Sequence, residues 1–242
     1  MNTDSMSLRN ISIILVAPQM GENIGAAARA IKNFAITDLR IVNPRDGWPN
    51  EKAKNMSVGA IEIIENAKIY NSVPDSIEDL EYVYAASAAP RDMNIDYALS
   101  RDLNSDISGY KHLGIMFGRE SSGLSNQEIS YANKIVTIDT DVNFSSLNIA
   151  HAVAVICYEA FQGVNQQRDD LSNFHELASH SDLEYFYDHL FDLLEQKSFF
   201  RTKDKKAHMS LKIRNLFNRI DHLSKQEIQT LRGVITTLAK DR

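Results

Sequence analysis

Five short apolar runs, each bounded by polar or turn-forming residues, constrain the fold of this chain more than any other feature of its sequence. Runs of this length are typical of β-strands that are buried on both faces of a parallel sheet. Helical segments are expected between them, and such alternation predicts an α/β domain with helices on both faces of the sheet. The expected strands are Ile11–Val16, Leu39–Val42, Tyr82–Ala86, Leu113–Phe117 and Ile135–Ile138.

The helices expected between these strands are marked by their ends and by their apolar spacing. Ser125 and Glu128 have the spacing of a capping box, which predicts a helix at the start of Ser125–Ala132. Leu147–Gln162 is apolar around almost its whole circumference, so we expect this helix to be enclosed between other elements. The remaining expected helices are Ile24–Ala35, a segment after Ser57, and Asp75–Leu80.

A second unit is predicted at the C-terminal end of the chain. Apolar periodicity is lost after Gly163, where amide and charged residues dominate, so residues 164–180 are the best candidate for a linker. Amphipathic segments follow, two of them opened by capping boxes at Ser181 with Glu184 and at Ser224 with Glu227. We therefore expect an α/β domain over residues 1–163 and a small all-helical, basic domain over residues 181–242.

Charge is divided unevenly along the chain. Residues 1–195 hold 14 Lys and Arg against 28 Asp and Glu, a net charge of −14, whereas residues 196–242 hold 12 against 4, a net charge of +8. The cations of the second part are interleaved with Phe199, Phe200 and Phe217, a mixture that suits phosphate contacts beside a packed face. A merely solvated helix surface is the alternative.

Composition excludes several other classes of protein. Cys157 is the only cysteine, so the chain has no intrachain disulfide and no cysteine cluster for zinc. No apolar run approaches the roughly 20 residues of a membrane-spanning helix, and the first residues lack the apolar core of a signal peptide. We therefore expect a cytoplasmic protein with no metal site and no membrane contact.

The segment Asn23–Phe34 begins with small residues and follows closely on the first expected strand. On a helix, Ala27 and Ile31 lie on one face while Arg29 lies on the opposite face. One face is expected to pack, and the other is either a solvated surface or free to act. A dinucleotide-binding fold is disfavoured, because the glycine fingerprint is incomplete and Asn43 stands where a ribose-binding acid is expected.

Two further stretches place polar side chains where parallel sheets hold ligands. Gly118 and Glu120 follow the strand Leu113–Phe117 in a glycine-bearing loop, at the carboxyl end of the sheet. Ser146 is a candidate N-cap of the apolar helix, and Asn148 then lies in its first turn. On a helix suited to burial Asn148 needs a hydrogen-bonding partner, which a ligand could supply. An ordinary turn and an ordinary cap are the alternatives.

In combination, the order NIGAAAR, FGRESSGLS and SSLN resembles the three motifs of the SPOUT methyltransferases, within their TrmH-like branch. The resemblance covers residues 11–162, and the aromatic and basic extension resembles the C-terminal part of the TrmJ-type enzymes. It implies a parallel sheet whose C-terminal part is threaded into a trefoil knot, and a homodimer that completes the active sites. It also implies S-adenosylmethionine-dependent methylation of a tRNA ribose 2′-hydroxyl, at the cytidine or uridine of anticodon-loop nucleotide 32.

The same resemblance assigns site residues motif by motif. Asn23 and Arg29 match the first motif, Glu120 the second, and Ser146 with Asn148 the third, and these five are the expected catalytic residues. The residues expected to contact the cofactor are Ala86, Ser87, Ala88, Gly118, Ile138, Ser145, Ser146 and Leu147.

Methyl transfer from a sulfonium requires in-line placement of the 2′-oxygen and removal of its proton. An arginine is a poor base in water, so Arg29 is expected to bind the substrate phosphate and to make the hydroxyl more acidic. Glu120, Ser146 and Asn148 are expected to orient Arg29 and the ribose.

One difference from the TrmJ-type pattern leaves part of the RNA site open. Those sequences often carry an arginine where this chain has Ala89, and here Arg91 follows two residues later. Two functional alternatives also stay open. One is methylation of ribosomal RNA or of another tRNA nucleotide, and the other is a non-catalytic RNA-binding protein that keeps the fold.

Overall fold

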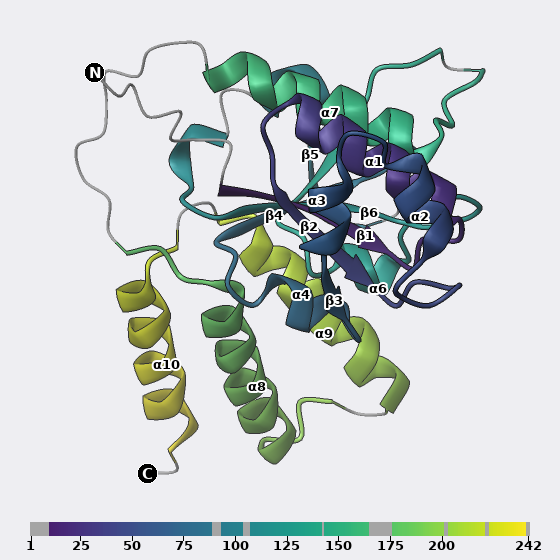
Figure 1. Ribbon diagram of the computed structural model, residues 1–242. Coiled ribbons are helices and arrows are strands. Elements are labelled where there is room, and N and C mark those ends of the chain that lie inside the picture. The colour runs from purple at the N-terminus through teal and green to yellow at the C-terminus, as the bar shows by residue number, and fades with distance from the viewer. Residues whose placement is uncertain are drawn as a thin grey trace.

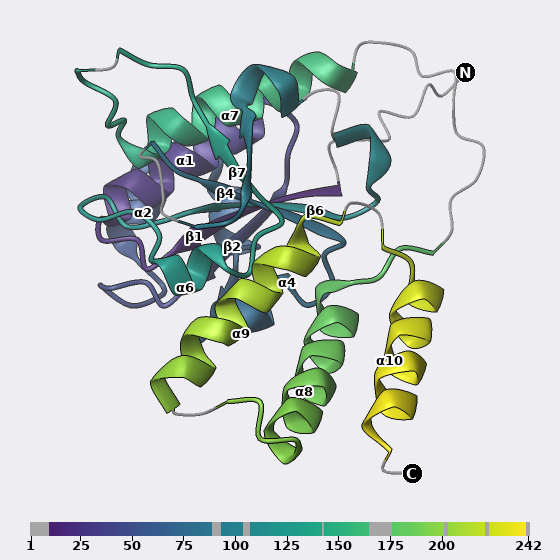
Figure 2. The ribbon, with the colours of Figure 1, turned by 180° about the vertical axis from the view of Figure 1, so that it is seen from behind.

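Within the described residues, seven parallel strands form one sheet in the order β3-β2-β1-β6-β4-β7-β5 (Figures 1 and 2). The computed structural model describes residues 10–88, 93–103, 107–141, 143–164, 176–200, 203–220 and 223–240. The two edge strands, β3 (Lys68–Tyr70) and β5 (Asp96–Leu99), are not predicted from the sequence. The five predicted strands are confirmed as β1 (Ile11–Val16), β2 (Asp38–Val42), β4 (Tyr82–Ala86), β6 (Leu113–Phe117) and β7 (Lys134–Thr137).

Separate apolar cores cover the two faces of the sheet, which confirms the expected α/β layers. Side chains alternate along β1, so Ile13 and Leu15 face one core while Ile14 and Val16 face the other. The first core lies beneath α1 (Gly21–Asn33), α2 (Glu51–Met56), α3 (Ile61–Glu65) and α7 (Ile149–Val164). The second lies beneath α4 (Val73–Ile77) and α6 (Asn126–Ile129), whose capping box of Ser125 and Glu128 is confirmed.

Helix α1 begins three residues before the predicted start at Ile24. Met20 is extended, and its carbonyl oxygen accepts hydrogen bonds from the N–H groups of Asn23 and Ile24 at 3.1 and 3.3 Å. Gly21 lies so close to Asn50 that a Cβ would stand 2.2 Å from the Asn50 Oδ1 atom. The earlier start places Asn23 in the first turn of α1, where its side chain is buried beside the end of the sheet.

Helix α7 is less enclosed than its composition suggests. It packs against α1, where the Phe34 ring lies 6.0 Å from the rings of Tyr158 and Phe161 between centroids. His151 is nevertheless exposed, and 47% of the surface of Tyr158 is exposed to solvent. The expectation that this helix is enclosed is wrong for the single chain, because the sheet and α1 cover only its inner side.

The C-terminal unit consists of α8 (His180–Gln196), α9 (Lys203–Asn218) and α10 (Lys225–Ala239), as expected (Figure 2). The predicted box of Ser224 and Glu227 is confirmed at α10. At α8 the predicted box of Ser181 and Glu184 is wrong, because Ser179 and Asp182 cap the helix two residues earlier. Glu184 instead accepts hydrogen bonds from the partly buried guanidinium of Arg214. Of the expected linker, residues 165–175 lie outside the described residues.

The C-terminal helices, α8 to α10, are attached to the α/β domain by buried polar contacts. The Asn218 amide donates to the carbonyl oxygens of Ser130 and Ala132 at 3.0 and 2.7 Å. The backbone N–H of His180 donates to the Leu80 carbonyl at 2.9 Å. Burial, together with the nearby charge of Arg214, lowers the pKa of His180 to about 4. None of the described helices is long and apolar enough to span a bilayer.

Candidate active site

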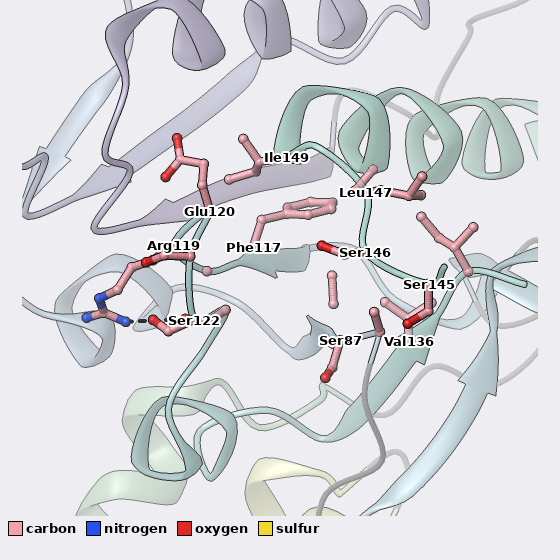
Figure 3. A pocket seen from close by; sticks show the side chains of 17 residues that line it. Ser87, Phe117, Arg119, Glu120, Ser122, Val136, Ser145, Ser146, Leu147 and Ile149 are labelled. Carbon is pink, nitrogen blue, oxygen red and sulfur yellow. Dashed lines mark hydrogen bonds between the residues drawn. The ribbon is translucent and has the colours of Figure 1, made fainter. Parts of the chain in front are cut away.

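A cavity of about 320 Å³ opens at the carboxyl ends of β4, β6 and β7 (Figure 3). Four segments form its wall: the end of β4, the loop after β6, the end of β7, and the segment that leads into α7. Every residue that the sequence assigns to the cofactor lines this cavity, namely Ala86, Ser87, Ala88, Gly118, Ile138, Ser145, Ser146 and Leu147. Glu120, from the second motif, also lines it.

The cavity also has an apolar lining that is not predicted from the sequence. Phe117 and Val136 contribute side chains from the ends of β6 and β7, and Ile149 and Ala152 contribute theirs from the first turn of α7. In Figure 3 the Phe117 ring and the Ser146 hydroxyl lie between Glu120 on one side and Ser145 on the other. The strand-end part of this lining could have been predicted from the sequence, because the last residues of parallel strands border the edge at which such sheets bind ligands.

The loop after β6 is folded tightly enough to require a glycine at position 118. Arg119 and Gly123 form a backbone bridge, with N···O distances of 2.8 and 3.2 Å, and Gly123 has a φ of 66°. A Cβ on Gly118 would stand 2.1 Å from the Gly123 carbonyl carbon and 2.2 Å from the Leu124 nitrogen. Both are backbone atoms, so no side-chain rotation can relieve the overlap.

Replacing Gly118 with alanine is therefore expected to displace this loop from the cavity wall. We expect the affinity for the cofactor proposed below to fall at least about tenfold and the free energy of unfolding to fall by about 1–3 kcal/mol. Calorimetric titration and urea unfolding measure the two effects. Gly233→Ala is the matched control, because a Cβ at Gly233 on α10 meets no atom within 4 Å. Equal affinities for Gly118→Ala and the wild type would contradict the prediction.

The Arg119 side chain stabilises this loop by pairing with Glu128, so it brings no unpaired positive charge to the cavity. Its guanidinium donates to both carboxylate oxygens of Glu128 at 3.0 and 2.9 Å. Glu128 also accepts from the backbone N–H of Ser125 at 2.7 Å. Burial opposes the charged form of Glu128, but the hydrogen bonds from Arg119 and Ser125 hold its pKa below the ordinary value. The charge that the Glu120 carboxylate brings to the cavity is therefore not neutralised by its neighbour Arg119.

A chain of hydrogen bonds joins the three sequence motifs beside the cavity. The Glu120 carboxylate accepts from the Asn23 amide at 2.8 Å and from the backbone N–H groups of Gln19 and Met20 at 2.9 and 3.3 Å. The Asn23 Oδ1 atom in turn accepts from the Asn148 amide at 3.0 Å. Asn23, Glu120 and Asn148 come from positions up to 125 residues apart, and the fold brings them into one fixed group.

Asn148, not Ser146, occupies the position before α7. The Asn148 Oδ1 atom accepts from the Ala150 N–H at 2.8 Å, which is a capping contact with the first turn of the helix. The partner that Asn148 needs is therefore Ala150 together with Asn23, and no ligand is required to satisfy it. Ser146 is left exposed at the cavity, with its hydroxyl free of a capping role.

Arg29 is not brought to this group within one chain. It lies six residues after Asn23 on α1, about 9 Å along the helix axis and on a different side of it. Its side chain is exposed and forms no hydrogen bond or ion pair with any residue in the described ranges. The expected contact of Glu120, Ser146 and Asn148 with Arg29 is thus missing inside the chain.

Two other expectations concern charge at the site. Among the described residues, no cluster of three or more His, Cys, Asp or Glu side chains is placed to hold a metal ion. Ala89 and Arg91, which bear on the cation at the edge of the RNA site, lie outside the described residues.

The fold and the cavity define the class first: an α/β protein whose ligand site is built from loops at the carboxyl ends of three parallel strands. Comparison with known families then identifies the family within this class. The model of the SpoU rRNA Methylase family matches residues 10–158, and that of the tRNA methyltransferase TrmJ C-terminal domain matches residues 181–242. The chain belongs to the SpoU rRNA Methylase family, which confirms the resemblance to the SPOUT methyltransferases.

Individual relatives agree with both matches. The chain is 34% identical over 239 residues to the tRNA (cytidine/uridine-2′-O-)-methyltransferase TrmJ of Klebsiella pneumoniae, covering 96% of this chain and 97% of that protein. It is 41% identical over 155 residues to the tRNA (cytidine-2′-O-)-methyltransferase TrmJ of Methanocaldococcus jannaschii, covering 62% and 67%. The crystal structure of TrmJ from Z. mobilis ZM4 is similar with a TM-score of 0.86 and 34% identity, covering 95% and 99%.

Proposed function

We propose that this protein transfers a methyl group from S-adenosylmethionine to a ribose 2′-hydroxyl of tRNA, at nucleotide 32. One observation carries the proposal: the second and third motif segments line one cavity, and Asn23 of the first motif is hydrogen-bonded to Glu120 and Asn148 beside it. The similarity to TrmJ proteins over nearly the whole chain supports tRNA as the substrate. The proposal includes a cytoplasmic location, where tRNA is available.

The cavity residues fit this cofactor. Its volume, about 320 Å³, lies at the lower end of the range for small-molecule sites. Apolar side chains such as Phe117 and Ile138 suit a purine ring, and the hydroxyls of Ser87 and Ser145 suit its polar groups. The Glu120 carboxylate favours a cationic ligand. When bound, S-adenosylmethionine supplies a methyl group on a positively charged sulfur.

The chain's own residues then position the ribose. In the proposed mechanism Asn23 and Asn148 keep the Glu120 carboxylate in one orientation, so that Glu120 and Ser146 hold the ribose with its 2′-oxygen facing the cavity. Arg29 binds the adjacent phosphate and makes the hydroxyl more acidic. Because Arg29 does not contact this group within its own chain, we propose a homodimer in which Arg29 serves the cavity of the partner subunit.

Two further parts of the proposal concern architecture. We propose that the chain from β7 through α7 is threaded as a trefoil knot, which would place the segment before α7 against the loop after β6. We also propose that residues 1–163 form the catalytic domain, residues 164–180 the linker, and residues 181–242 a basic domain that binds RNA. The net charge of +8 over residues 196–242 supports the last assignment, because the rest of the chain is acidic.

The test measures binding and transfer separately. Calorimetry with S-adenosylmethionine in the presence of a chelator is expected to show one site per chain. Incubation of the full-length protein with unmodified tRNA, followed by ribose-methylation mapping, is expected to show one methylated ribose, at nucleotide 32. Loss of binding on chelation would contradict the metal-free site. Methylation of ribosomal RNA alone, or of another tRNA nucleotide, would overturn the proposed substrate and leave the chemistry intact.

A further inference from the structure

Phe144 is an exposed aromatic residue directly before the segment that lines the cavity. Its side chain keeps 79% of its surface exposed, although a phenyl ring gains by being buried. No described ring packs against it. The next three residues, Ser145, Ser146 and Leu147, all line the cavity. In Figure 2 the described residues between β7 and α7 extend outward from the body of the sheet.

The backbone beneath this ring is held in a turn. The Phe144 N–H donates to the Asp141 carbonyl oxygen at 3.0 Å, and the Asn143 N–H donates to the Asp141 carboxylate at 2.7 Å. These two hydrogen bonds tie the backbone of Asn143 and Phe144 to Asp141. An exposed ring next in sequence to cavity residues is suited to receive a flat apolar surface.

We propose that Phe144 stacks on the base of the nucleotide whose ribose is methylated. The proposal rests on the proposed function, because it requires an RNA substrate. Phe144 is two residues before Ser146, and consecutive Cα atoms are about 3.8 Å apart. The base is attached to the carbon next to the one that bears the 2′-hydroxyl. A ribose placed at Ser146 therefore carries its base within reach of the Phe144 ring.

Charge and chemistry favour a base over the other parts of a nucleotide. Asp141 stands in the same turn, and its carboxylate disfavours a phosphate group there. Unstacked bases in RNA loops are commonly held against aromatic side chains. Phe144 thus supplies affinity for an unpaired nucleotide, and a base that remains stacked in a duplex cannot make this contact.

The test compares variants of the full-length protein on the tRNA nucleotide that the wild type methylates. Phe144→Ala is expected to lower kcat/KM by about 10- to 100-fold, mainly through KM, with the affinity for S-adenosylmethionine unchanged. Phe144→Tyr is expected to retain near-normal values, whereas Phe144→Leu, which keeps apolar volume without a ring face, is not. Leu238→Ala is the matched control, because Leu238 on α10 is also 79% exposed.

A second measurement separates stacking from a merely structural role. With an abasic residue at the methylated position, the wild type is expected to lose RNA affinity to the level of Phe144→Ala, and the variant to lose little more. Equal losses in both proteins, rescue by Phe144→Leu, or a change of oligomeric state in Phe144→Ala would overturn the proposal. An active wild type with an unaffected Phe144→Ala would overturn this proposal alone. A wild type that methylates no RNA would overturn the proposed function, and this proposal with it.

Discussion

Replacing Arg29 with alanine is expected to lower the rate of methyl transfer by about 100- to 1,000-fold, while folding and S-adenosylmethionine affinity stay nearly unchanged. The reason is its position: the side chain is exposed and has no partner among the described residues, so its loss removes no contact that holds the fold. Its contribution is expected only when RNA is bound and charge develops on the 2′-oxygen. Single-turnover kinetics, calorimetry and urea unfolding measure the three quantities.

Lys32→Ala is the matched control for this prediction. Lys32 is also exposed on α1, but its ammonium pairs with Glu62 at 2.8 Å and donates to the Gly59 carbonyl at 2.8 Å. Its loss is therefore expected to cost little activity. A large loss of stability in Arg29→Ala would mean that Arg29 is structural, and near-normal turnover would mean that its proposed role is wrong.

Mixed dimers test whether Arg29 serves the partner subunit. The Arg29→Ala and Glu120→Gln proteins are each expected to be inactive when expressed alone, and coexpression lets the two kinds of subunit form mixed dimers. If the two residues meet across the dimer, a mixed dimer holds one site with both residues intact. A statistical mixture is then expected to recover up to about a quarter of the wild-type rate. If Arg29 acted within its own chain, every site in the mixture would lack one residue and no activity would return.

The parts of the fold that follow a strong apolar pattern could be predicted, and the short edge strands could not. β1 and β6 are buried at every position, so their runs are unambiguous. β3 has only three residues, and two of them, Lys68 and Ile69, are exposed. Such a strand is formed by pairing with β2 rather than by its own sequence. Helix α2 was missed for a related reason, because of its six residues only Ala53 is buried.

The motif residues of the candidate site could be named from the sequence, but the apolar lining of the cavity is not predicted and the connections between the motifs could not be. The motif residues could be named because their types and order follow a known pattern. That Asn23 links Glu120 to Asn148 depends on side-chain geometry between elements about 100 residues apart, which no local pattern encodes. The same holds for Arg40, which lies within an apolar run yet is buried and donates to Asp38 and Asp79, each at 2.9 Å.

The structure also changes what the basic C-terminal segment is expected to do. Several of its cations already have carboxylate partners: Arg214 binds Glu184, and Arg219 and Lys225 pair with Asp96 and Glu176 at 3.1 and 2.6 Å. Arg214 is also enclosed by aromatic rings, 4.5 Å from the centroid of Tyr187. These residues attach α8 to α10 to one another and to the sheet. The net charge therefore overstates the cations that are free for RNA.

Truncation after Gly163 is for this reason a poor test of RNA binding. It would remove Asn218 from the carbonyl groups of Ser130 and Ala132 and would uncover the surface beneath α8 and α9. Substitutions that change charge without removing a helix avoid this. Such charge-changing substitutions can be made at the start of α9, at Lys203, Lys205 and Lys206.

Changing Lys203, Lys205 and Lys206 together to glutamine is expected to weaken tRNA binding on the order of 100-fold at 0.1 M salt, if about two of them bind phosphates. The salt dependence should fall by the number of these lysines that bind phosphates, and Lys206, which pairs with Glu195 at 2.5 Å, counts among them only when that ion pair opens on RNA binding. The acidic α/β domain repels RNA, so the loss of local cations is not compensated there. Affinity against salt concentration, measured with the full-length protein, checks both numbers.

The substitution Glu195→Gln is expected to change tRNA affinity in the opposite direction. It releases Lys206 from its ion pair, so tRNA binding is expected to strengthen at low salt and to become more salt-dependent. Changing Lys32, Lys54 and Lys68 to glutamine removes the same total charge from the α/β domain and controls for net charge. If all of these proteins give the same binding curve, RNA is held by the α/β domain alone. If the two lysine triples weaken binding equally, net charge governs affinity and the start of α9 has no special part in it.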